Sequence, residues 1–192
     1  MKKAKENKGE ITIKNMVCDR CIATVESSLK QLGAEDVEVK LGMARYSNSL
    51  DLKEVENTLA AHGFELIKNA QEVLMEQVKI FLQSLLNQLP LTLDDKLSNL
   101  LARQFAVSYP NLSKLFSQHE GITIERYFLL LKVEKAKELI QYGRLNFTEI
   151  AQQLDYAHVN HFSKQFKSFV GMSLSDYKGQ EVTRRRGIDK IV

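Results

Sequence analysis

The chain has 192 residues, of which 44% are hydrophobic and 27% are charged, a balance that is ordinary for a globular protein. A chain of this length can form one large domain or two small ones. The longest uninterrupted apolar run, residues 127–131, is too short to cross a bilayer, and the basic N-terminus lacks the apolar core of a signal peptide. We therefore expect a cytoplasmic protein with no membrane partner.

The formal net charge of +3 is unevenly distributed along the chain. Residues 1–70 carry equal numbers of acidic and basic side chains, so the positive excess lies in residues 71–192. We predict a disordered tail over residues 1–8, which are polar and charged, and a basic tail over residues 179–192. The three arginines at 184–186 can bind phosphate or remain solvated, and the sequence does not separate these two roles.

Residues 9–69 alternate between strand-like and helix-like patterns. Apolar residues at every second position predict strands, and apolar residues three or four positions apart predict helices. In chain order these segments are a strand at 10–17, a helix at 22–32, strands at 37–41 and 44–46, a helix at 52–59 and a strand that begins at 64. The order β-α-β-β-α-β predicts an α+β domain with the ferredoxin-like arrangement.

Both cysteines of the chain lie in one C-x-x-C motif, at Cys18 and Cys21. In a cytoplasmic protein this spacing favours metal binding or redox chemistry over a structural disulfide. The motif lies where the first strand meets the first helix, so the helix N-terminus is expected to lower the pKa values of the thiols. Two thiolates on an exposed loop suit Cu(I) or another soft metal ion, whereas Zn²⁺ prefers four ligands and the chain has no second cysteine pair.

Residues 10–68 resemble the heavy-metal-associated domain of copper chaperones and metal-pumping ATPases. Met16, Cys18 and Cys21 match the metal loop of that family, written GMxCxxC, and the resemblance implies that Cys18 and Cys21 are the metal ligands. His62 matches the loop that lies beside the metal site in the family. The resemblance therefore leaves His62 as a third ligand or as an ordinary residue at the end of a helix.

The chain departs from this family at Asn15, where glycine is usual, and in a short middle hairpin. Three interpretations of the cysteine pair stay open: a soft-metal sensor, a thiol–disulfide redox switch, and a fold inherited without a metal function. The order of strands and helices does not match that of a thioredoxin-like enzyme.

Residues 70–90 predict an amphipathic helix that connects two domains and ends at Pro90. Its apolar stripe consists of Leu74, Val78, Phe81, Leu85 and Leu89. This stripe can pair with a second copy of the chain, which would form a homodimer through residues 70–89, or it can pack on its own neighbours.

An internal repeat marks the remaining residues, 91–178, whose patterns are all helical. The segment LSKLF at 112–116 matches FSKQF at 162–166, an offset of 50 residues. The offset persists downstream in two further pairs, Gly121 with Gly171 and Tyr127 with Tyr177. Two copies of one small helical unit are therefore expected.

Each copy consists of an apolar helix, a short turn and a second helix that ends at a glycine, which is the layout of a helix-turn-helix unit. In the second copy, residues 147–154 form the supporting helix and residues 158–169 form the helix expected in the major groove. The equivalent groove helix of the first copy is expected over 108–119, and a long helix over 124–142 separates the two copies. Asp155 in the second turn belongs to the few residue types that tolerate a left-handed backbone.

Residues 91–178 resemble the AraC/XylS-type DNA-binding domain, in which two helix-turn-helix units contact successive major grooves. The resemblance places the base-contacting positions on Pro110, Ser113, Lys114, Val159, Asn160, Ser163 and Lys164. The outward polar pattern of the two groove helices adds Asn111, His158 and His161, which can hydrogen-bond bases or phosphates. Because Pro110 offers no N–H donor, the first helix is expected to contact bases weakly or to recognise DNA shape.

These patterns together predict a two-domain, sequence-specific DNA-binding transcription regulator. Its N-terminal domain is expected to respond to a soft metal such as Cu(I), the only cofactor implied, or to dock a metal-carrying partner protein. Double-stranded DNA is the main expected partner. The alternative is a metal-trafficking or redox-switch protein whose helical half binds a protein instead of DNA. The sequence contains no catalytic constellation and no Gly-rich phosphate loop, so we do not expect an enzyme.

Overall fold

The computed structural model describes residues 9–179, which fold as two compact units. The first unit ends at Ile80 and the second begins at Phe81. The predicted disordered tail at 1–8 and the predicted basic tail beyond Gly179, with its three arginines, lie outside the described residues. No helix within the described part of the chain is both long enough and apolar enough to cross a membrane.

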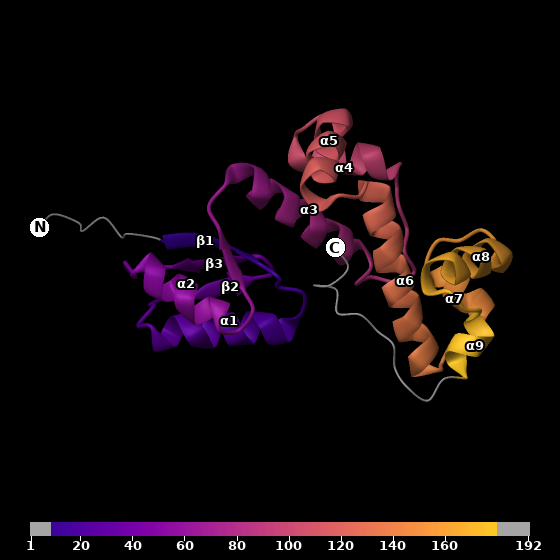
Figure 1. Cartoon of the computed structure of the whole chain (residues 1–192), viewed down its shortest axis with the longest axis horizontal. Helices are drawn as coiled ribbons and strands as arrows, with labels where there is room; N and C mark the ends of the chain where they lie inside the picture. The colour runs from indigo at the N-terminus through magenta and orange to yellow at the C-terminus, as the bar shows by residue number, and fades with distance from the viewer. Residues whose placement is uncertain (1–8, 180–192) are drawn as a thin grey trace, which may run out of the picture. The chain divides into compact units, whose positions relative to one another are not determined.

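The first unit is a four-stranded antiparallel sheet with two helices inserted between its strands. Its elements are β1 (Gly9–Lys14), α1 (Asp19–Gln31), β2 (Glu38–Lys40), β3 (Met43–Tyr46), α2 (Leu52–Ala60) and β4 (Glu65–Ile67). They follow one another in the predicted order, and the strands lie side by side in the order β2-β3-β1-β4 (Figure 1). β1 is a central strand because it pairs with both β3 and β4.

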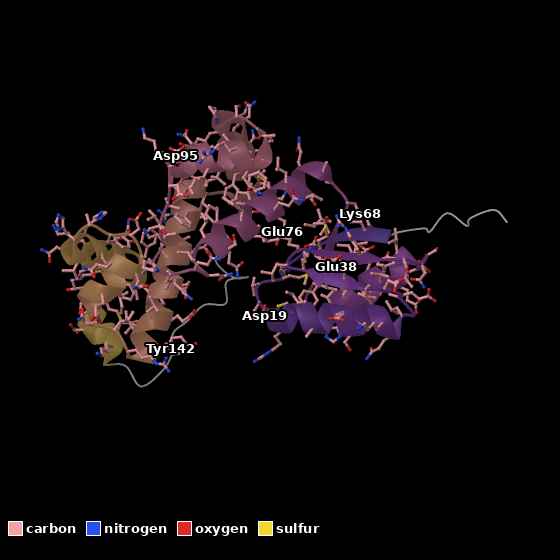
Figure 2. All side chains as sticks on the ribbon, turned by 180° about the vertical axis from the view of Figure 1, so that it is seen from behind. Asp19, Glu38, Lys68, Glu76, Asp95 and Tyr142 are labelled. Carbon is pink, nitrogen blue, oxygen red and sulfur yellow. The ribbon has the colours of Figure 1, made fainter. Side chains whose placement is uncertain are left out.

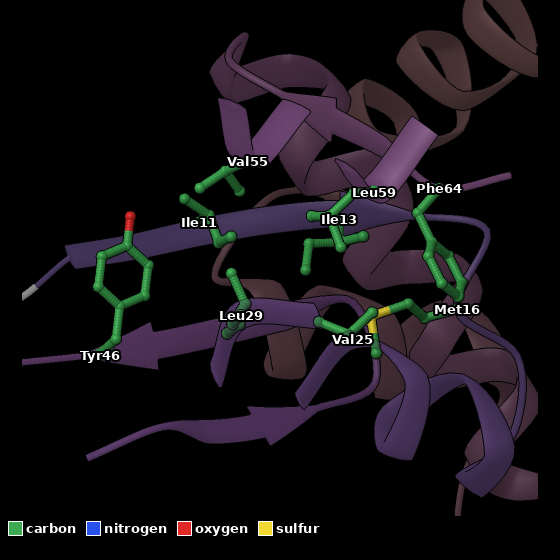
Figure 3. Close-up of a cluster of buried hydrophobic side chains, with 10 residues drawn as sticks. Ile11, Ile13, Met16, Val25, Leu29, Tyr46, Val55, Leu59 and Phe64 are labelled. Atoms are coloured by element: carbon green, nitrogen blue, oxygen red, sulfur yellow. The ribbon is translucent and has the colours of Figure 1, made fainter. Parts of the chain in front are cut away.

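The core of the first unit follows from the alternation along β1. Ile11 and Ile13 are buried and the residues beside them are not, as expected for a strand with one face against a core. Ile11 lies opposite Ala44 on β3, and Ile13 lies opposite Leu66 on β4. The helices complete this core with Val25, Leu29, Val55 and Leu59 (Figure 3).

Three turns meet at the end of the sheet where β1 passes into α1. Figure 3 shows Met16, which follows β1, at the same end as Phe64, which precedes β4, and both side chains are buried. The Asn15 side chain donates to the carbonyl of Gly63 at 3.1 Å, which ties the first of these turns to the turn after α2. The backbone N–H of Ile13 donates to the carbonyl of Gly42 at 2.9 Å, which adds the turn between β2 and β3. The C-x-x-C motif therefore begins at a closely connected end of the domain.

The predicted connecting helix is α3 (Ala70–Leu85), which ends before Pro90. After Leu85 the N–H groups of Leu86 and Asn87 bond to carbonyls three residues back, so the α-helical pattern stops there. The boundary between the two compact units falls inside this helix. Of the predicted stripe only Val78 is fully buried, whereas the most buried apolar side chains are Met75, Val78, Leu82 and Leu86.

The regular secondary structure in the described part of the second unit is entirely helical. Its helices after α3 are α4 (Leu97–Phe105), α5 (Tyr109–Glu120), α6 (Ile124–Tyr142), α7 (Phe147–Gln153), α8 (Val159–Val170) and α9 (Leu174–Lys178). Figure 1 shows α6 running between the α4–α5 pair and the α7–α8 pair. α6 is buried along much of its length and includes a buried ion pair, Lys137 with Glu134 at 2.6 Å. Only its last residue, Tyr142, is a large hydrophobic side chain left mostly in solvent (Figure 2).

Candidate nucleic-acid interface and cysteine loop

The two copies of the internal repeat share the same unusual backbone positions. The turn between α4 and α5 contains Ala106 with a φ of 52°, and the turn between α7 and α8 contains Asp155 with a φ of 59°. The helix that follows each turn ends at a glycine in the left-handed region, Gly121 with a φ of 71° and Gly171 with a φ of 84°. The left-handed conformation expected for Asp155 is confirmed. The repeat in the sequence is therefore a repeat in the fold.

Equivalent aromatic contacts hold each copy together. Phe116 on α5 packs against Tyr127 on α6 with ring centroids 5.6 Å apart, and Phe166 on α8 packs against Tyr177 on α9 at 5.4 Å. All four rings are buried. Because α5 and α8 turn these aromatic faces inward, their opposite faces point away from the core.

The outward faces of α5 and α8 carry the predicted DNA contacts in two separate sets. The exposed members are Pro110, Asn111 and Lys114 on α5, with His158, Asn160, His161 and Lys164 on or just before α8. The half-buried members are Ser113, Val159 and Ser163. His158 is the N-cap of α8, and the ring of His161 packs edge-on against Tyr156 with centroids 5.6 Å apart. None of the ten predicted contacts is buried, and each set clusters near the start of one helix.

The C-x-x-C motif forms the entrance to α1. Cys18 is the N-cap of α1 and is exposed, whereas Cys21 is half-buried in the first turn. Their sulfur atoms lie 3.5 Å apart. In Figure 2 the neighbouring Asp19 marks the start of this helix. Both thiols are free, and they face each other at the end of the sheet where the three turns meet.

The surroundings of Cys18 favour its thiolate. Partial burial acts to raise the pKa of Cys18, but hydrogen bonds from the backbone and thiol of Cys21 and from the backbone of Arg20, together with the positive charge of Arg20, outweigh it. The net effect is a pKa below the ordinary thiol value, as expected for a cysteine at a helix N-terminus. The sequence-based prediction of a lowered pKa is confirmed for Cys18.

The described residues contain no group of three or more cysteine, histidine or carboxylate side chains that could share a metal ion. His62 is exposed at the end of α2 and is therefore not assembled with the cysteines as a third ligand. The two cysteine sulfurs therefore have no third potential metal ligand grouped with them among the described residues.

Comparisons with known proteins concern the second unit. Residues 101–180 match the family model described as a helix-turn-helix domain. A region of 112 residues, 56% of this chain, is 32% identical to the HTH-type transcriptional activator RhaS of Salmonella paratyphi B and covers 38% of that protein. The C-terminal domain of AraT, a response regulator from Geobacillus stearothermophilus, is similar over 59% of this chain and 90% of that chain, with a TM-score of 0.50 and 24% identity. The C-terminal half of this chain carries a helix-turn-helix domain, and it is similar to domains of the AraC type.

The match covers less than half of the length of the RhaS relative. A transcriptional regulator from Chromobacterium violaceum, described with AraC-type DNA-binding domains, is similar over 55% of this chain and 96% of that chain, with a TM-score of 0.46 and 20% identity. After this similarity, the region from α4 to α9 is called the AraC-type domain.

Sequence reasoning missed one polar side chain on the outer face of the AraC-type domain. Tyr109 begins α5, is half-buried, and donates a hydrogen bond from its hydroxyl to the carboxylate of Glu125 at the start of α6. Burial and the hydrogen bond to Glu125 raise the pKa of Tyr109 well above its ordinary value. The repeat could have identified it, because the offset of 50 places Tyr109 at the position of Val159, a predicted DNA contact.

The second turn of the AraC-type domain rests on a buried lysine of α6. The ammonium group of Lys132 lies 4.1 Å from the centroid of the Tyr156 ring, and the Tyr156 hydroxyl donates to the side-chain carbonyl of Gln165 on α8. Burial lowers the pKa of Lys132 to about 8, against the opposing influence of the Asp155 carboxylate. Burial also raises the pKa of Tyr156 to about 12. These contacts connect α6 to the turn that sets the direction of α8.

Proposed function

We propose that this protein is a sequence-specific DNA-binding transcription regulator whose N-terminal unit responds to a soft metal ion, with Cu(I) as the best fit. The observation that carries the proposal of DNA binding is the duplicated polar face on α5 and α8, joined by one unbroken helix. α6 has 19 residues, which at about 1.5 Å per residue gives a length of roughly 28 Å. This length is close to the roughly 34 Å that separates successive turns of a major groove.

The side chains on the two faces suit different parts of DNA. Lys114 and Lys164 hold equivalent places in the repeat, and each can contact phosphate or the acceptor edge of guanine. Asn160 on α8 has an amide that can pair with adenine in the major groove, whereas its equivalent on α5 is Pro110, which has no donor. We therefore propose that α8 contributes more hydrogen bonds to bases than α5 does.

We propose that the first unit is a ferredoxin-like domain of the heavy-metal-associated type. The strand order β2-β3-β1-β4 and the position of C-x-x-C between β1 and α1 support this assignment. Asn15 supports it as well, because its φ of 71° lies in the left-handed region that glycine adopts most readily. The departure from glycine at this position therefore keeps the backbone that a glycine would supply.

The chemistry of the cysteine loop fits a soft monovalent ion. Thiolate sulfur is the ligand that Cu(I) prefers, and the lowered pKa of Cys18 favours that form of the side chain. A structural Zn²⁺ site needs about four ligands, and the described residues supply two sulfurs with no third donor grouped beside them. Cys18 and Cys21 would hold the ion, which would supply a positive charge at the start of α1.

Two further partners belong to this proposal. A metal-carrying protein would deliver Cu(I) by exchange of thiolate ligands at the exposed Cys18. A second copy of this chain would pair through the half-buried apolar residues of the segment 70–89, such as Leu74 and Leu85. Metal binding would then shift an equilibrium between arrangements that present the DNA-binding faces differently.

The proposal is tested with the full-length reduced protein and Cu(I) buffered by a competing chelator. Wild type is expected to bind one equivalent of Cu(I), and its affinity for duplexes selected from a random library is expected to change when the metal binds. The Cys18→Ser/Cys21→Ser variant is expected to lose both effects. A His62→Ala variant is the matched control and is expected to keep both, because His62 is not grouped with the cysteines.

Two results would contradict the proposal. Absence of Cu(I) binding by the wild type would remove the metal response, and metal-dependent DNA binding that survives in the double cysteine variant would place the metal elsewhere. Sedimentation with and without Cu(I) separates the dimer from the monomer.

A further inference from the structure

The two copies of the repeat differ at the first turn of the groove helix. In the first copy, Tyr109 on α5 donates its hydroxyl hydrogen to Glu125 on α6. Ser113, one turn further along α5, acts in the opposite direction on the pKa of Tyr109 and so lies beside this pair. Ser113 is itself one of the predicted DNA contacts, so this small network lies at the edge of the candidate interface.

The fold does not need this network. At the offset of 50 residues the second copy has Val159 and Ser175 in place of Tyr109 and Glu125, and it still forms the same helix, turn and helix. The N-terminus of the following helix is also capped without Glu125, because the side chain of Thr123 accepts from the backbone N–H of Arg126. A tyrosine and a carboxylate held together on one outer face therefore point to a role in recognition.

The direction of the hydrogen bond determines what Tyr109 can offer to DNA. A phenol has one hydrogen to donate and oxygen lone pairs to accept with. Since the hydrogen is directed to Glu125, the hydroxyl can interact with a further partner only as an acceptor. An acceptor backed by a carboxylate repels phosphate and the acceptor edge of guanine, and it attracts the exocyclic amino groups of cytosine and adenine.

We propose that the Tyr109–Glu125 pair is a specificity determinant that selects a base with an exocyclic amino group, cytosine or adenine, in the DNA segment contacted by α5. This inference rests on the proposed function, because it deepens the account of DNA binding. It also gives the first helix a base contact that Pro110 cannot provide. The second helix has no equivalent acceptor at Val159, so the two halves of the operator would be recognised by different chemistry.

The test is a selection of duplexes from a random library by the full-length protein. Wild type is expected to enrich two blocks of sequence about one helical turn apart. Tyr109→Phe is expected to lose the preference for cytosine or adenine at one position of one block, with a fall of about tenfold in relative affinity there. Glu125→Ala removes the acceptor of the phenol hydrogen, so the hydroxyl can donate to a base, and guanine or thymine should become acceptable at the same position.

Tyr142→Phe is the matched control, because it removes the same atom from the exposed end of α6 and should leave both blocks unchanged. If Tyr109→Phe and Glu125→Ala enrich the same sequences as wild type, the pair has only a structural role and the inference is overturned, whatever the thermal midpoints of the two variants. If the wild type enriches nothing, DNA binding itself fails and the inference falls with it. The pattern of outcomes thus separates the two failures.

Discussion

At the scale of single residues, Cys18 combines exposure with a lowered pKa. Hydrogen bonds from Cys21 and from the backbone of Arg20 stabilise its thiolate, and the positive charge of Arg20 adds to them. The thiolate is the form that binds metal and reacts with electrophiles. The loop therefore presents a cysteine whose reactive form is favoured at the N-terminus of α1.

The charge of Arg20 gives a testable contribution to this reactivity. In Arg20→Gln the pKa of Cys18 is expected to rise, so alkylation by iodoacetamide near neutral pH should slow by a few-fold and its pH profile should move to higher pH. Lys30→Gln, at the other end of α1 and paired with Glu26, is the control. Identical profiles for Arg20→Gln and wild type would show that the hydrogen bonds to Cys18, and not the charge of Arg20, lower its pKa.

Lys132 is the second residue whose ionisation is coupled to the structure. Burial lowers its pKa in the folded protein to about 8, whereas a lysine in an unfolded chain titrates at about 10.4. Between these two pKa values the unfolded chain binds a proton that the folded chain has released. The free energy of unfolding should therefore rise as the pH increases through this window, and the penalty for a buried charge is fully present below it.

The expected size of this effect is on the order of 1 kcal/mol between about pH 7.5 and about pH 9.5. It is measured by urea unfolding of the full chain, as the difference between wild type and Lys132→Met, which should lack this contribution. Lys178→Met is the matched control, because Lys178 also lies over an aromatic ring, that of Phe147, but is exposed. Parallel stability curves for wild type and Lys132→Met would contradict the lowered pKa.

At the scale of elements, the repeat explains why so much of the helical half was predictable. Matched glycines and aromatic residues at an offset of 50 fix where each helix ends and which face it buries, and α6 has the bounds that its sequence predicted. The exact last residue of α3 was not predictable. After Leu85 the backbone N–H groups bond to carbonyls three residues earlier, and this change does not alter the spacing of apolar residues in the sequence. Tyr109 and Lys132 were missed because their partners, Glu125 and Tyr156, become neighbours only in the folded chain.

The left-handed positions of the repeat predict opposite effects of glycine and alanine. Ala106→Gly is expected to raise the free energy of unfolding by about 1 kcal/mol, because its φ of 52° is unfavourable for a residue with a Cβ atom. Gly171→Ala is expected to lower it by about 1 kcal/mol through the backbone alone, since a Cβ atom there would meet nothing within 4 Å. Urea unfolding of both variants measures the effects.

Asp155→Gly is the informative comparison for this pair of variants. Its φ of 59° is similar to that of Ala106, but aspartate tolerates this region better and its carboxylate interacts with Lys132. The gain should therefore be smaller than for Ala106→Gly. An equal gain at both positions would mean that the charge of Asp155 contributes nothing to the turn.

At the scale of the whole molecule, the two candidate sites lie in different compact units, and the boundary between these units falls inside α3. The thiols lie in the first unit, and the duplicated polar faces lie in the second. Phe81 is the first residue of the second unit and lies in α3. Its ring packs edge-on against that of Phe105 at the end of α4, with ring centroids 5.8 Å apart. Because the boundary falls inside α3, this helix contributes residues to both units, and its second portion contacts α4.

If both copies contact DNA at once, their contributions to the salt dependence of binding should add. Each phosphate that the protein neutralises makes the slope of log Kobs against log salt more negative by about 0.9. Lys114→Ala and Lys164→Ala should each make this slope shallower by about 0.9, and the double variant should make it shallower by about 1.8. Lys40→Ala, in the first unit and paired with Glu38, should leave it unchanged. A double variant no different from one of the single variants would show that only one of the two helices reaches the backbone, and a flat slope in the wild type would favour a protein partner over DNA.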